Sequence, residues 1–150
     1  MKRHKKKAAL LATDYGALYR EIYAPAFQAI DLLLKTMERP LTVAEAAGAL
    51  HMPPARAVHI MRRENIHILD KFGFLALMRL GDSPLCGLYQ RELTRGVKAV
   101  YSAQDIAYIY GLDEGHVRGI SAQLGHQEWP SEHVHELLAH VPVFIMRGES

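Results

Sequence analysis

The chain has 150 residues, of which 49% are hydrophobic and 23% charged, a composition typical of a soluble globular protein rather than a disordered one. Its single cysteine, Cys86, excludes a disulfide framework and a cysteine-based structural zinc site, and it favours a reducing compartment. No apolar run approaches the ~18 residues of a membrane span, and the basic start precedes too short an apolar stretch for a signal peptide. We therefore expect a cytoplasmic protein of one domain or two small ones.

The net charge of +2 is distributed unevenly along the chain. Residues 1–40 hold eight Lys or Arg and four Asp or Glu, and residues 41–81 hold five and three. Residues 101–141 hold one basic residue against six acidic ones. The basic N-terminal half and the acidic C-terminal half of the chain predict that the two halves bind different partners.

The first 40 residues predict a basic, flexible tail over residues 1–13 and a helical segment over residues 14–40. One apolar face of this segment consists of Tyr15, Leu18, Tyr19 and Ile22. Pro25 is expected to end or kink that helix, because proline lacks an N–H donor. The next apolar face, at three- and four-residue spacing, consists of Phe27, Ile30, Leu34 and Met37. This second face either packs on the following residues as core or forms a homodimer contact.

Residues 41–81 and 101–141 form an internal repeat at an offset of 60 residues, without a gap. In the first copy Thr42 is followed three positions later by Glu45, a spacing that predicts a capping box at a helix start. Ser102 and Asp105 repeat this spacing. The apolar positions match in the pairs Ala46/Ile106, Ala47/Ala107, Leu50/Tyr110, Met52/Leu112, Ala57/Val117, Ile60/Ile120, Leu69/Trp129, Phe74/Val134, Leu77/Leu137 and Met78/Leu138. We therefore predict three helices in each copy, and we call residues 41–81 unit 1 and residues 101–150 unit 2.

The turn between the first two helices differs between the units. Such a turn favours a residue with positive φ, which Gly111 supplies in unit 2 and His51 must supply in unit 1 at some conformational cost. Pro54 suits the first position of a helix, whereas Pro53 has no side chain that could cap one. We therefore expect a rigid but poorly capped turn in unit 1.

Unit 1 resembles a bacterial helix-turn-helix domain in its pattern Thr42-Val-Ala-Glu-Ala-Ala47, with Leu50 and Met52 and a second helix behind them. Unit 2 is closer to the pattern, with Asp105-Ile-Ala-Tyr-Ile-Tyr-Gly-Leu112. An extended stretch over residues 66–69, followed by an amphipathic helix from about Phe72, resembles the compact winged modules of MerR-like regulators and phage excisionases. This resemblance covers about half of the chain. It implies a mainly α fold with short wing hairpins and DNA binding by the second helix of a unit.

Residues 82–100 predict a helix that connects the two units. The sequence Asp82-Ser83-Pro84 is typical of a helix start, and Gly96 marks the end. The apolar side of this helix consists of Leu85, Leu88, Tyr89 and Leu93.

The second helix of unit 1, residues 54–63, is the candidate recognition helix. Ala57 and Ile60 are expected to face the core, which leaves the basic side chains on the outer face. We predict DNA contacts from Arg56, His59, Arg62, Arg63 and Lys71. The alternative interpretation is a solvated basic face, which is common on any soluble helix.

The matching helix of unit 2 opens with Asp113 and Glu114, followed by His116 and Arg118. Its first turn is the part that a helix-turn-helix normally presents to the groove, and DNA phosphates would repel acidic side chains there. We therefore expect unit 2 to keep the fold and to bind a protein or a second copy of the chain.

The histidines and the cysteine do not predict a catalytic or metal site. His133, His135 and His140 lie close in sequence, but His140 follows His135 at i+5 instead of the i+4 of zinc proteases, ~140° away around the helix. Cys86 lies beside Leu85 on an apolar face, as expected for a buried, inert thiol. No Gly-x-Ser-x-Gly elbow, P-loop or Rossmann fingerprint occurs. We expect no metal, no cofactor and no enzymatic activity.

These patterns together predict a bacterial or phage DNA-binding protein of the cytoplasm and nucleoid, either a transcriptional regulator or an architectural factor of the excisionase kind. Unit 1 would bind double-stranded DNA, and unit 2 would bind a protein or its own copy. The alternative is an interaction adaptor that uses both helix-turn-helix folds as a scaffold. The modest basic character of unit 1 favours that alternative.

Overall fold

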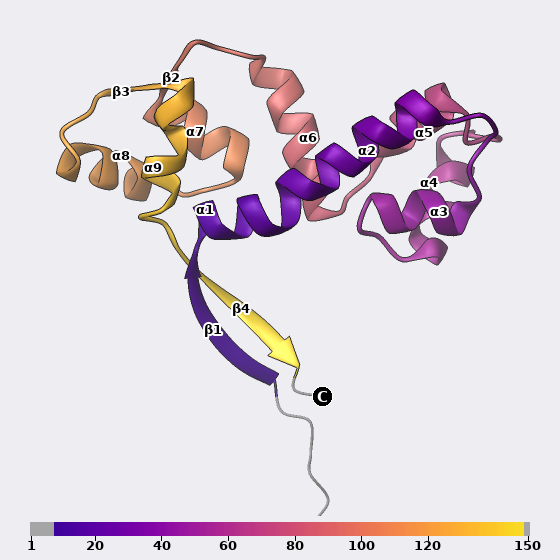
Figure 1. The fold of residues 1–150 in the computed structure, drawn as a ribbon, viewed down its shortest axis with the longest axis horizontal. Helices are drawn as coiled ribbons and strands as arrows, with labels where there is room; N and C mark the ends of the chain where they lie inside the picture. The colour runs from indigo at the N-terminus through magenta and orange to yellow at the C-terminus, as the bar shows by residue number, and fades with distance from the viewer. Residues whose placement is uncertain (1–7, 149–150) are drawn as a thin grey trace, which may run out of the picture.

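The computed structural model describes residues 8–148 of the chain, and side chains over residues 13–144. Residues 1–7, the more basic part of the predicted tail, lie outside the described residues. Most of the described chain is helical, so the predicted mainly α class is confirmed (Figure 1). Within residues 8–148 no helix combines the length and the apolar character needed to cross a membrane.

The two ends of the described chain lie side by side. Strand β1 (Ala8–Asp14) pairs antiparallel with strand β4 (Pro142–Gly148), and the two strands project together from the helical part (Figure 1). The prediction of a flexible tail was therefore wrong for residues 8–13. Local composition did not reveal this strand, because its partner lies at the other end of the chain.

The helical segment after β1 continues through Pro25. It consists of α1 (Tyr15–Leu18), a π-helical turn (Tyr19–Tyr23) and α2 (Ala24–Thr36). The N–H of Ala24 bonds the carbonyl of Tyr19, five residues earlier, so the helix widens directly before the proline. Pro25 has no N–H, and its ring would clash with the carbonyl of Glu21 in a regular α-turn. The proline therefore widens the helix and does not end it, contrary to one of our two expectations.

The apolar face of α2 is covered by unit 1. Ile30 is only 4% exposed, and Phe27 and Leu34 pack against the same core. Met37 is half-buried just beyond the helix end. This packing corrects the prediction of a homodimer contact through Phe27, Ile30, Leu34 and Met37, because the apolar surface that motivated it is largely used inside the chain.

The first two helices of each unit start at matching positions. In unit 1 the helices are α3 (Val43–Ala49), α4 (Pro54–Arg63) and α5 (Lys71–Leu80). In unit 2 they are α7 (Ala103–Tyr110), α8 (Glu114–Gln123) and α9 (Val134–Leu138), with a 3₁₀ turn (Ser131–His133) before α9. The first helix of each unit starts 60 residues apart, as does the second. The internal repeat read from the sequence is therefore also a repeat of backbone structure.

Hydrogen bonds repeat with the same offset. Thr42 forms a capping box with Glu45, and Ser102 forms one with Asp105, as predicted. The turns close alike, because the N–H of Met52 bonds the carbonyl of Ala47 at 3.0 Å and that of Leu112 bonds Ala107 at 2.8 Å. The paired helices of both units consequently leave their turns in the same direction.

Each unit has two residues with positive φ, again 60 positions apart. His51 (φ 58°) matches Gly111 (φ 66°) in the turn between the paired helices. Asn65 (φ 59°) matches Gly125 (φ 76°) after the second helix. Glycine adopts this backbone region freely, whereas histidine and asparagine adopt it at a cost. The requirement of the turn is therefore the same in both units, and only unit 2 meets it with glycine.

The wing hairpins that the resemblance implied are absent from the described residues. In unit 2 the strands β2 (Val100–Ser102) and β3 (Glu128–Pro130) pair antiparallel, but α7 and α8 lie between them in the chain. In unit 1 residues 66–69 are not a strand, and the equivalent contact is a single bond from Leu41 N–H to Leu69 O at 2.9 Å. In both units, these contacts join the residues before the first helix to the segment before the third helix. They do not form a hairpin.

The connecting helix α6 (Pro84–Arg95) links two hydrophobic cores, one around unit 1 and one around unit 2. Its buried residues Leu85 and Cys86 belong to the unit 1 core. The hydroxyl of Ser83, the residue that caps α6, donates to the carbonyl of Leu50 at 2.7 Å. Further along, Arg91 donates from Nε to the carbonyl of Ile109 in unit 2 at 2.9 Å. The helix is therefore anchored to both units.

In each unit, the acidic residue of the capping box forms ion pairs with basic side chains of the preceding segment. Both guanidinium nitrogens of Arg39 bond the carboxylate of Glu45, at 2.8 and 3.0 Å. In unit 2 Lys98 and Arg95 contact Asp105 at 3.1 and 3.2 Å. The hydrogen bonds from Arg39, together with that from the Thr42 N–H, lower the pKa of Glu45 to about 2.

Exchange of the turn residues tests the cost of positive φ. We expect His51→Gly to stabilise the protein by about 1 kcal/mol, because relief of a left-handed side chain outweighs the entropy that glycine adds to the unfolded state. Gly111→Ala should destabilise it by about 1 kcal/mol. Urea denaturation of both variants measures these changes. Equal destabilisation by the two substitutions would contradict the assignment.

The acid sensitivity of unit 1 tests the Arg39–Glu45 pair. Because folding lowers the pKa of Glu45 from 4.5, its stabilising effect is complete above about pH 4.5 and is lost as the pH falls toward 2. Glu45→Gln keeps the capping box without the charge. Between about pH 6 and pH 3, this variant should lose less unfolding free energy than the wild type. Glu38→Gln, an exposed neighbour, is the control and should follow the wild type.

Candidate nucleic-acid interface

The predicted recognition helix α4 is held in unit 1 by its inner face. Ala57 and Ile60 are completely buried, as predicted, and they belong to the core that also contains Ala46 and Leu50. Pro53, the residue before the helix, provides no side-chain cap, which also agrees with the sequence. The remaining positions of α4 form an outer surface, on which four of the five predicted DNA-contacting residues lie.

Arg56 is half-buried and ion-paired. Its Nε donates to Oδ2 of Asp82 at 2.8 Å, and Asp82 lies in the turn before α6. The hydrogen bond from Arg56 lowers the pKa of Asp82, so the carboxylate keeps its charge to a lower pH than an ordinary aspartate does. The first turn of α4 therefore presents an arginine whose charge is balanced by an acid on the next connecting segment.

Arg63 lies on the same side of α4 as Arg56, two turns further along. Its Nε donates to Oε1 of Glu64 at 3.0 Å, and its charge also contributes to the lowered pKa of Asp82. Two cations and two acids thus lie together along this side of the helix. This part of the surface is close to electrically neutral.

His59 and Arg62 lie on a different line along α4. Together with Ala55 they are spaced one helical turn apart, and all three residues are exposed. Among the side chains described over residues 13–144, neither His59 nor Arg62 forms a hydrogen bond or an ion pair. Lys71, the first residue of α5, is also exposed. His59, Arg62 and Lys71 are therefore the polar groups of the predicted set that are available to a ligand.

The equivalent line on α8 of unit 2 carries no charge. At the positions of Ala55, His59 and Arg62 it has Gly115, Gly119 and Ala122, all exposed. The one arginine of this helix, Arg118, bonds Oε1 of Glu114 at 2.8 Å, and Asp113 caps the helix by accepting from the His116 N–H. The same scaffold thus presents cations in unit 1 and small or acidic residues in unit 2.

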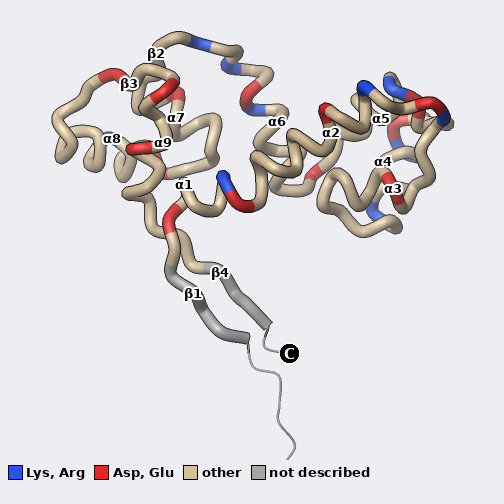
Figure 2. The backbone as a smooth tube through the Cα atoms, in the orientation of Figure 1, with Lys and Arg blue, Asp and Glu red and all other residues tan. Residues whose placement is uncertain are grey.

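The distribution of charge along the backbone follows the same division. In Figure 2 Lys and Arg are interspersed with Asp and Glu around α3, α4 and α5. Around α7, α8 and α9 the acidic positions dominate, in agreement with the sequence count for residues 101–141.

The histidines near the end of the chain and the single cysteine, which we did not expect to form a site, are also described by the structure. His133, His135 and His140 are all exposed, and a ring nitrogen of His133 lies 2.9 Å from Glu136, which raises the pKa of His133. Cys86 is completely buried, as predicted, and burial raises the pKa of its thiol.

Sequence analysis missed Asp82 as a partner of the recognition helix. Asp82 is 26 residues from Arg56, and we interpreted it only as part of a helix start. No periodic pattern joins these positions, because their contact depends on how α5 returns the chain to the start of α4.

Comparison of the chain with protein-family models, with curated proteins and with solved structures gives no match. The assignment of a function therefore depends on the residues and geometry described above.

Proposed function

We propose that the protein binds double-stranded DNA through α4, the recognition helix of a helix-turn-helix in unit 1. The observation that carries the proposal is the difference between two matching helices. At corresponding exposed positions, α4 has His59, Arg62 and Arg63, whereas α8 has Gly119, Ala122 and Gln123. Apart from Ser121 on α8, the buried positions of both helices are apolar, so the difference between the helices lies at their exposed positions.

The geometry of unit 1 suits this role. Two short helices joined by a turn of four residues, with the second helix exposed along one side, match the way in which a helix-turn-helix enters the major groove. Arg56, in the first turn of α4, and His59, near the middle of the helix, would face base edges. Arg62, Arg63 and Lys71 would contact phosphates. The resemblance to MerR-like regulators and excisionases favours a regulator or an architectural factor.

Unit 2 would act on a different partner. Asp113 caps its second helix and Glu114 lies in the first turn of that helix, and DNA phosphates would repel both side chains. We assign to unit 2 the binding of a protein, either another chain or a second copy of this one. A dimer formed in this way would bring two copies of α4 to one duplex.

A second candidate function, an interaction adaptor without DNA contact, is favoured by an apolar patch on unit 1. Phe72 is 84% exposed and Ile68 is 53% exposed. The corresponding positions of unit 2 are Glu132 and Glu128. Exposed apolar side chains of this size are typical of protein contacts. The ion pairs of Arg56 and Arg63 also favour the adaptor, because they reduce the free positive charge of α4.

Removal of one free cation distinguishes the two candidates. If α4 contacts phosphates, Arg62→Ala should weaken duplex binding and reduce the slope of log K against log salt by about one unit. The matched control is Arg118→Ala on α8, which should leave binding unchanged. Electrophoretic mobility shifts at several salt concentrations measure both. The adaptor candidate predicts that wild-type protein and both variants bind duplex equally weakly.

Removal of the competing acid should have the opposite effect. Asp82→Asn keeps the shape of the side chain and frees Arg56, so duplex binding should tighten by up to about fivefold, since an exposed ion pair contributes about 0.2–1 kcal/mol. Glu114→Gln is the matched control, because it frees Arg118 on the helix that we do not place on DNA. Tighter binding by the control variant alone would place the DNA on unit 2.

A further inference from the structure

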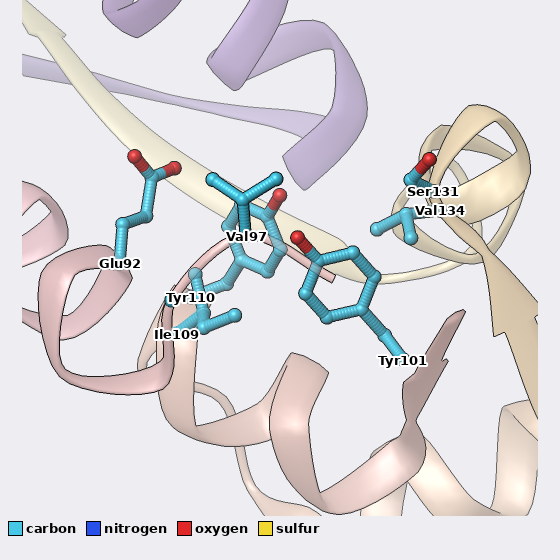
Figure 3. A pocket seen from close by; sticks show the side chains of 8 residues that line it. Glu92, Val97, Tyr101, Ile109, Tyr110, Ser131 and Val134 are labelled. Atoms are coloured by element: carbon cyan, nitrogen blue, oxygen red, sulfur yellow. The ribbon is translucent and has the colours of Figure 1, made fainter. Parts of the chain in front are cut away.

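A cavity of about 220 Å³ lies between the end of α6, α7 and the start of α9. Its polar lining consists of the side chains of Glu92, Tyr101, Tyr110 and Ser131, and its apolar walls are Val97, Ile109 and Val134. Figure 3 shows the hydroxyl groups of Tyr101 and Tyr110 directed toward the same space, and Val97, which also lines the cavity, is fully exposed to solvent. A drug-sized ligand needs roughly 300 Å³ or more, so this space suits a smaller molecule.

The carboxylate of Glu92 has no cation of its own. Glu92 is half-buried, and burial alone raises its pKa, with no compensating hydrogen bond or charge among the described residues. Its charge also contributes to the raised pKa values of Tyr19 and Tyr110, which places these phenols close to it. A carboxylate withdrawn from water in this way gains free energy when a cation approaches it.

The neighbouring cations are bound elsewhere. Arg91 bonds the carbonyl of Ile109. Arg95 contacts Asp105 and lies 4.6 Å from the ring centre of Tyr108. Lys98 also contacts Asp105, at 3.1 Å. Each of these side chains therefore already has a partner in unit 2, and none of them bonds the Glu92 carboxylate among the described residues.

We infer that this cavity binds a small primary amine, with its ammonium group between Glu92 and the hydroxyl groups of Tyr101 and Tyr110. An ammonium group has three N–H donors, and a carboxylate and two phenol oxygens supply three acceptors. The Tyr101 oxygen already accepts from the Lys98 N–H at 3.1 Å, and a hydroxyl oxygen accepts two hydrogen bonds. The carbon chain or ring of the amine contacts Val97, Ile109 and Val134.

The lining selects against other ligand classes. An anion would meet Glu92 without a compensating cation. A neutral molecule would leave the carboxylate desolvated and unpaired. Ca²⁺ takes six to eight oxygen ligands, commonly with several carboxylates, and the cavity provides one carboxylate.

Calorimetric titration of the full chain with benzylamine, and with benzyl alcohol as the neutral molecule of the same shape, tests the inference without DNA. We expect benzylamine to bind at least about tenfold more tightly, because a charge-assisted hydrogen bond contributes about 1.5–3 kcal/mol. This comparison uses the wild-type protein alone. No saturable binding of benzylamine at millimolar concentration, or equal binding of amine and alcohol, would overturn the inference.

Substitution then locates the site. Glu92→Gln should reduce benzylamine affinity roughly tenfold and leave benzyl alcohol unaffected. Glu132→Gln, an exposed acid outside the cavity, is the matched control and should bind benzylamine as the wild type does. Thermal unfolding of each variant verifies that it is folded. Equal losses of affinity in the two variants would show that the amine is attracted by the acidic surface of unit 2 and not by the cavity.

Discussion

The turn between the paired helices is the constraint on which the two units depend. The chain must reverse within four residues, and a left-handed residue at 51 or 111 allows the next N–H to reach back to the carbonyl of an alanine. This closure sets the direction of the second helix. It also determines which of its side chains are buried, so that Ala57 and Val117 fill the two cores alike. In unit 1 the same direction requires His51 to adopt the left-handed backbone region, which is energetically unfavourable for a residue with a side chain.

Once the turn fixes the scaffold, the exposed positions are free to differ. Apart from Ser121, the inner faces of α4 and α8 are apolar, whereas at matching exposed positions α4 has His59 and Arg62 and α8 has Gly119 and Ala122. The same holds at the third helix, where Phe72 in unit 1 corresponds to Glu132 in unit 2. Because folding does not require these differences, they carry the argument for a division of function between the units.

The features predicted correctly from the sequence are local or periodic. Capping boxes, the buried faces and the offset of 60 residues are all properties of short segments, and each unit repeats them. Two contacts join segments that are distant in sequence, namely the pairing of β1 with β4 and the ion pair of Arg56 with Asp82. In neither case does the local sequence of one partner predict the other. The apolar face of α2 illustrates the limit most clearly. Its period showed that Ile30 is covered, but it did not show whether unit 1 or a second chain covers it.

Helix α6 connects the two sites discussed above. Directly before its first turn Asp82 pairs with Arg56 of the proposed recognition helix, and near its end Glu92 lines the cavity. Its 12 residues span about 17 Å as a rigid rod, because each residue adds about 1.5 Å. Leu85 and Cys86 are buried in unit 1, while Arg91 and Arg95 hold unit 2. The cavity and the ion pair between Asp82 and Arg56 therefore lie at opposite ends of one helix that is anchored in both units.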